Sequence, residues 1–93
     1  EKNCDFALKV SGDSMEPKIP DGSIVLVKEC ESVDEGKIGA FFYDGQVYCK
    51  RMLYKAGNSY LESINKNYAP ILIHPECVFK VYGMIVGVEK DKT

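Results

Sequence analysis

The chain has 93 residues, of which 45% are hydrophobic and 28% charged, and its formal net charge is −2 at pH 7. These values predict one small globular domain with a single core and exclude disordered and collagen-like chains. No apolar run approaches the ~20 residues that a membrane-spanning helix needs. The slightly acidic balance argues against nucleic-acid binding by these residues alone, because domains that bind DNA or RNA usually carry a basic patch.

The cysteines are Cys4, Cys30, Cys49 and Cys77, and the only histidine is His74. None of the cysteines forms a CxxC pair, and zinc sites need ligands at short spacings, so we expect no metal and no other cofactor. An even number of cysteines permits two disulfides. However, Cys4, Cys49 and Cys77 lie in or beside apolar stretches, where free cysteine behaves as a small buried hydrophobe. We therefore favour free thiols and a cytoplasmic location.

Short apolar runs alternate with clusters of Gly, Pro, Asn and Asp, which is typical of an all-β protein. Residues 6–10 alternate in polarity and predict a strand. Residues 11–22 contain two prolines and two glycines, and predict a loop with one helical turn after Met15. Residues 24–27 are continuously apolar, which predicts a strand that is buried on both faces.

The middle of the chain predicts a β-hairpin. Residues 40–43 and 46–54 are rich in strand-forming side chains and flank Asp44-Gly45, a strong two-residue hairpin signal. Ala56-Gly57-Asn58 predicts the next turn, and residues 59–64 predict the strand that follows it.

The last third predicts a loop and one long strand. Residues 65–76 are polar and include two prolines, so we expect a loop with a short edge strand at 71–73. Residues 78–88 are apolar and β-branched and predict the final strand, with bulges or bends at Gly83 and Gly87.

Ser14 is the first candidate for chemistry, because it lies on a Gly-containing turn directly after the first predicted strand. Such a turn can expose a hydroxyl and aim successive backbone N–H groups at one point, as an oxyanion hole requires. Without further context, this pattern favours a structural role for Ser14, as a turn former or a helix cap.

Lys50 is the second candidate. Strand alternation places it on one face with Tyr48, Met52 and Tyr54, so its amine would sit within an apolar stripe. Burial can lower the pKa of a lysine by ~3–5 units, and a neutral amine can accept a proton from a serine hydroxyl. Without further context, the sequence favours a Lys50 whose aliphatic part lies along the sheet and whose amine reaches water.

Context strengthens both candidates. Residues 6–17, FALKVSGDSMEP, and their continuation to 27 resemble the nucleophile region of the LexA-type family of self-cleaving repressors. Residues 46–53, QVYCKRML, are similar to the family's second motif, in which a strand after a hairpin carries a general-base Lys followed by Arg. Residues 81–88 are similar to its C-terminal strand. The resemblance spans about residues 5–88, with the motifs in the right order and spacing.

The resemblance implies an all-β fold of mostly antiparallel curved sheets. Signal peptidases share this core and are membrane-anchored, whereas we expect no spanning or anchoring segment in these residues. It implies that Ser14 is the nucleophile and Lys50 the general base. The backbone N–H groups of Asp13 and Ser14 would be the oxyanion donors. Met15 would pack the nucleophile loop, and the site would also rest on two neighbours of Lys50 along the strand. These neighbours are Met52 and Tyr48, the latter bulkier than the small hydroxyl residue that some members carry there.

The resemblance further implies a homodimer, with the C-terminal strand at the interface, that cuts a loop upstream of the nucleophile strand. An activated RecA filament promotes this cut in the family's response to DNA damage, and repression ends. We expect the chain, which lacks an initiator Met, to be a fragment or processed product. The helix-turn-helix domain that contacts DNA and the cleavage loop would lie outside it. Ala56-Gly57 matches the common Ala-Gly cleavage pair, but its position predicts a turn.

The rival interpretation is a dimerisation module that has lost proteolysis. The two differ in one testable feature: an active dyad needs the Ser14 hydroxyl within hydrogen-bond reach of a buried Lys50 amine.

Overall fold

The computed structural model describes residues 3–91, which form seven β-strands and no helix. The strands are β1 (Phe6–Lys9), β2 (Ile24–Lys28), β3 (Ile38–Tyr43), β4 (Gln46–Lys55), β5 (Asn58–Glu62), β6 (Ile71–Leu72) and β7 (Phe79–Glu89). They form one sheet in the order β1-β2-β7-β3-β4-β5-β6, and every pairing is antiparallel. The predicted all-β, antiparallel fold is confirmed. Residues 3–91 contain no helix long and apolar enough to cross a membrane.

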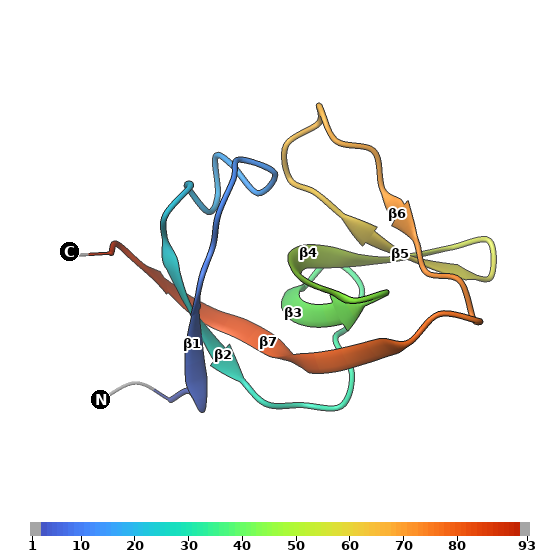
Figure 1. Cartoon of the computed structure of the whole chain (residues 1–93), viewed down its shortest axis with the longest axis horizontal. Coiled ribbons are helices and arrows are strands. Elements are labelled where there is room, and N and C mark those ends of the chain that lie inside the picture. Colours follow the sequence, from blue (N-terminus) through green and yellow to red (C-terminus); the bar gives the residue numbers. More distant parts are fainter. Residues whose placement is uncertain (1–2, 92–93) are drawn as a thin grey trace.

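The long strand β7 joins the two halves of the sheet (Figure 1). Its first half pairs with β3 and its second half with β2. The register shifts by one residue on β7 at Tyr82, opposite β3, and again at Val86, opposite β2. Each bulge directly precedes a glycine predicted as a bend point, Gly83 or Gly87. Bulges increase the local twist of a strand, so β7 can turn the two halves toward each other.

Gly83 is required by close packing. A Cβ added there would lie 2.3 Å from the backbone carbonyl oxygen of Lys28, at the end of β2. No side chain can occupy that space without moving backbone, so β2 and β7 approach this closely only because residue 83 is glycine.

Two hydrophobic clusters pack against the curved sheet. One lies under β1, β2 and the Ser11–Gly22 loop, and its buried members are Met15, Ile19, Val25, Val27 and Ala40. The other lies under β3, β4 and β5, and its buried members are Val33, Phe41, Tyr43, Met52 and Leu61. The single core expected from the length is therefore divided into two parts.

The predicted turns are present. Asp44 and Gly45 have φ angles of 49° and 86°, and Ala56 and Gly57 have 54° and 80°. Positive φ at both central residues is the signature of the tight turn that matches the twist of a hairpin. The short edge strand β6 also lies where residues 71–73 predicted it.

Two further predictions are refined. Ile19 N–H donates a 2.8 Å hydrogen bond to the Met15 carbonyl, which is the i to i+4 bond of the expected helical turn. In contrast, β2 is not fully buried on both faces. Its residues alternate between buried, as at Val25 and Val27, and half-buried, as at Leu26. Val25 and Val27 share the face that packs into the first cluster, whereas Leu26 points to the opposite face.

Candidate active site

Ser14 lies on a loop whose two ends are joined by backbone hydrogen bonds and whose Met15 side chain is buried in the core. Gly22 N–H donates to the Val10 carbonyl, and Val10 N–H donates to the Ser23 carbonyl, each at 2.8 Å. Met15, the residue after Ser14, is fully buried in the first cluster. Because Met15 points into the core, Ser14 stays at the surface end of the turn.

Lys50 lies in the middle of β4, between β3 and β5. The alternation expected from the sequence places Lys50 and Met52 on the inner face, where the Lys50 residue is only 7% exposed. Met52 belongs to the second cluster. The amine is therefore held inside the fold and does not reach into bulk water.

The Lys50 amine donates a 2.9 Å hydrogen bond to Ser14 Oγ and a second one, also 2.9 Å, to Ser63 Oγ. The first contact joins residues 36 positions apart in the chain. The structure therefore has both features that the serine–lysine dyad requires, a Ser14 hydroxyl within hydrogen-bond distance of the Lys50 amine and a buried Lys50. Ser63, just after β5, is 3% exposed and was missed from the sequence.

Burial of the Lys50 amine lowers its pKa below the usual 10.5, and the neighbouring Cys49 opposes this shift. Burial also raises the pKa of the Cys49 thiol to about 11, while Lys50 pulls it down. Near neutral pH Cys49 is consequently a neutral thiol, and no carboxylate among residues 3–91 forms an ion pair with the amine. Burial therefore favours the neutral, proton-accepting form of Lys50 more than water does for a free lysine.

Two tyrosine rings flank the amine. The Lys50 Nζ atom lies 5.9 Å from the centroid of the Tyr48 ring and 5.7 Å from that of Tyr68. Rings at this distance attract an ammonium group through their quadrupole. Tyr48, expected to support the site, therefore contacts Lys50 through its ring and not through a hydroxyl. Tyr68 comes from the β5–β6 connection and was not predicted.

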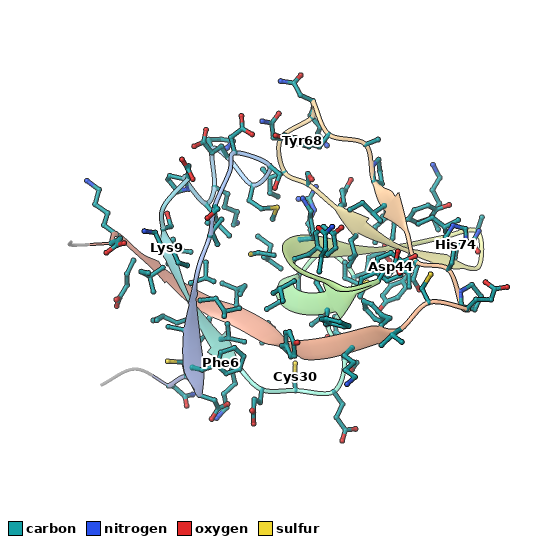
Figure 2. The ribbon with its side chains drawn as sticks, viewed as in Figure 1. Phe6, Lys9, Cys30, Asp44, Tyr68 and His74 are labelled. Carbon is teal, nitrogen blue, oxygen red and sulfur yellow. The ribbon has the colours of Figure 1, made fainter. Side chains whose placement is uncertain are left out.

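The β5–β6 connection forms hydrogen bonds with the turn that carries Ser14. Asn65 donates a hydrogen bond from its backbone N–H to the Ser14 carbonyl at 2.9 Å, and another from Nδ2 to the Asp13 carbonyl at 3.1 Å. The Tyr68 hydroxyl donates to the Asp13 carboxylate, which raises the pKa of Tyr68. Figure 2 shows Tyr68 on this connection, facing the Ser11–Gly22 loop.

The backbone N–H groups of Asp13 and Ser14 are used in no hydrogen bond within the part of the chain that the structure describes. Unpaired N–H groups next to a hydroxyl can receive an oxyanion. The site thus contains a hydroxyl, a buried amine and two available N–H donors.

A groove of about 440 Å³ opens beside Ser14 and Lys50. Its walls include Leu8 and Val10 of the first strand region, Val25 of β2 and Tyr48 of β4. His74 does not line it; the His74 backbone N–H instead donates to the Tyr43 hydroxyl. A mostly apolar groove ending at a hydroxyl and an amine can hold an extended peptide next to the reactive atoms.

The four cysteines are free thiols. Among residues 3–91, no group of three or more His, Cys, Asp or Glu side chains is arranged to hold a metal ion.

Comparison with known proteins agrees with this arrangement. The sequence profile of the family described as Peptidase S24-like matches residues 1–86. The chain belongs to the Peptidase S24-like family. The match includes the Ser14 turn, the Lys50 strand and most of β7, so the resemblance to LexA-type proteins is confirmed at the level of the family.

Several LexA repressors are similar to this S24-like chain. The repressor of Pelagibacter ubique is 38% identical over 94 residues, covering 98% of this chain and 41% of the repressor. That of Paramagnetospirillum magneticum is 40% identical over 85 residues, covering 89% and 36%. That of Carboxydothermus hydrogenoformans is 34% identical over 86 residues, covering 89% and 41%. The chain thus spans about two fifths of the length of these relatives.

Sequence reasoning missed Ser63, Asn65 and Tyr68. One signal was available for Ser63. Strand alternation places Ser63 on the same face as Leu61, which is buried, so the Ser63 hydroxyl is expected to point inward. Nothing local marks Asn65 or Tyr68, because their partners lie more than 50 residues earlier in the chain.

Proposed function

We propose that this chain is the C-terminal self-cleavage and dimerisation domain of a LexA-like or prophage repressor, a serine endopeptidase with a Ser14–Lys50 dyad. The observation that carries the proposal is the 2.9 Å contact between the Ser14 hydroxyl and a Lys50 amine that is 7% exposed. A buried, carboxylate-free amine of lowered pKa is the base that a serine nucleophile needs when no histidine is present.

In the proposed reaction, Ser14 Oγ attacks a peptide carbonyl carbon and its proton passes to the neutral Lys50 amine. The carbonyl oxygen becomes an oxyanion that the N–H groups of Asp13 and Ser14 stabilise. The carbon–nitrogen bond then breaks, and the leaving amine takes the proton back from the Lys50 ammonium. This leaves an ester on Ser14. Water hydrolyses the ester by the same proton route, releasing a carboxylate and restoring the hydroxyl.

The proposed substrate is the protein's own loop upstream of β1. Two features support it: the apolar groove at Ser14 has room for an extended segment, and β1, which borders the groove, is an edge strand of the described sheet. Cutting this loop would separate the domain from an N-terminal DNA-binding domain and end repression after DNA damage. In this proposal an activated RecA filament is the trigger, and the protein acts in the cytoplasm.

The proposed homodimer would use the C-terminal strand. Tyr82, Val86 and Val88 of β7 are exposed although apolar or aromatic, which is unusual for three residues of one strand. DNA would be contacted only through the separate N-terminal domain, in keeping with the net charge of −2.

The test is self-cleavage by a chain that carries its upstream loop. Alkaline incubation should cut the loop, and Ser14→Ala or Lys50→Ala should each abolish cutting while circular dichroism shows an intact fold. Cutting that survives in either variant rules out the dyad. A folded, dimeric wild-type protein that neither cuts nor reacts at Ser14 would instead support a dimerisation module without catalysis.

A further inference from the structure

We propose that Asn65 is a positioning residue that orients the peptide group between Asp13 and Ser14, so that the Ser14 N–H is aimed for oxyanion binding. The proposal rests on the function proposed above. It concerns a residue outside the dyad, on the connection between β5 and β6.

Asn65 holds the nucleophile from both sides. Its Nδ2 atom donates to the carbonyl that precedes Ser14, and its backbone N–H donates to the carbonyl of Ser14 itself. The Glu16 N–H also donates to the Asp13 carbonyl, at 3.1 Å. The carbonyls on both sides of the nucleophile are therefore restrained by one residue that lies 51 positions further along the chain.

The orientation of the Asn65 amide is itself determined. Its Oδ1 atom accepts a 3.0 Å hydrogen bond from the Asn67 N–H, and Tyr68 N–H donates to the Asn65 carbonyl at 3.2 Å. Oxygen must face the Asn67 donor, so nitrogen faces the Asp13 carbonyl. The side chain reaches Ser14 already fixed by its own turn.

Because a peptide group is planar, fixing the direction of the Asp13 carbonyl also fixes the direction of the Ser14 N–H. The only cis peptide bond in the described residues is Glu16–Pro17, so the bond between Asp13 and Ser14 is trans. In a planar trans peptide the C=O and the N–H point in opposite directions. Holding the Asp13 carbonyl toward Asn65 therefore points the Ser14 N–H away from Asn65, where it has no partner within residues 3–91.

The experiment follows phosphonylation of Ser14 by a fluorophosphonate, whose phosphoryl oxygen needs the same N–H donors as a peptide oxyanion. Asn65→Asp keeps the shape and the Asn67 contact but loses the Nδ2 donor; Asn65→Ala loses the side chain. Removing one oxyanion donor outright costs about 100- to 1,000-fold in rate. Misorienting one should lower the limiting rate by about 10- to 100-fold while the half-saturating reagent concentration stays within about twofold.

The matched control is Asn67→Ala, because the Asn67 side chain is exposed and only its backbone contacts Asn65. It should react like the wild type. A positioning role also leaves the pH midpoint of the reaction unchanged in the Asn65 variants, since Lys50 is untouched. Rates are scaled to the folded fraction from urea denaturation, which removes a purely structural loss.

A wild-type measurement covers the case in which the variants do not fold. The Asn65 side-chain amide protons should exchange with solvent more slowly than those of Asn67. Equal exchange, unchanged limiting rates, or a shifted pH midpoint in the variants each overturn the role of Asn65. Wild-type protein that is not labelled at Ser14 overturns the proposed function and this inference with it, whereas labelled wild type with equally reactive Asn65 variants overturns the inference alone.

Discussion

Ser63 and Ser14 accept hydrogen bonds from the same amine, that of Lys50, each at 2.9 Å. Ser14 lines the groove, whereas Ser63 does not line it and is buried, with 3% exposure. The ring of Tyr48 lies beside the same amine, with its centroid 5.9 Å from Lys50 Nζ. The buried hydroxyl that holds the amine is therefore supplied by the end of β5.

Replacing Ser63 with Ala should weaken both the site and the fold. The buried amine would lose one of two partners, which costs about 1–3 kcal/mol when no water replaces it. We expect a lower free energy of unfolding in urea and slower fluorophosphonate labelling of Ser14. Ser59→Ala makes the same change on β5, away from Lys50, and should have little effect. Equal behaviour of the two variants would argue against a supporting role for Ser63.

The labelling rate of Ser14 should rise with pH as Lys50 loses its proton. Because burial lowers the pKa of the amine, the midpoint should lie below the usual lysine value of 10.5. The rate is measured from pH 6 to pH 10 in buffers of constant ionic strength. Lys50→Ala should remove the rise, and a wild-type profile that is flat across this range would exclude Lys50 as the base.

Lys50 should also make stability depend on pH in a defined direction. Its pKa is lower in the folded protein than in the unfolded chain, so between the two values the unfolded chain binds more protons and stability rises with pH. Below the folded-state pKa the amine is charged in both states and its burial penalty is fully present. Lys50→Met should therefore stabilise the protein more at pH 7 than at pH 9.5.

Urea denaturation of both proteins at the two pH values measures this difference, and comparing variants cancels most other titrating groups. A Lys50→Met effect that stays constant or grows toward pH 9.5 would contradict the lowered pKa.

Gly83→Ala should destabilise the sheet far more than Gly87→Ala. At Gly83 a Cβ would lie 2.3 Å from the Lys28 carbonyl oxygen, which belongs to backbone. At Gly87 the nearest atom is Leu26 Cδ1, at 3.0 Å, and this flexible side chain can move. We expect a cost at the upper end of about 1–3 kcal/mol or beyond for the first change and under about 1 kcal/mol for the second. Thermal melting of the pair checks this, and similar melting temperatures would contradict the close approach of β2 and β7.

Much of the local structure could be predicted because the responsible signals are local. Asp44-Gly45 adopts the positive φ angles that its residue types favour, and the two glycines of the last strand mark its bulges. The interpretation of β2 as fully buried was wrong for Leu26, because apolar runs do not reveal on which side of a sheet the core lies.

The sequence by itself determined the strands, their turns, and the two residue types that suit a serine–lysine reaction. Only the tertiary structure decided that Lys50 is buried, that it meets Ser14, and that Ser63 and Asn65 complete the arrangement. The physical reason is that these contacts depend on strand register and chain closure. A one-residue slip of β4 would turn Lys50 to the other face, and the partners of Asp13 lie 52 and 55 residues away along the chain.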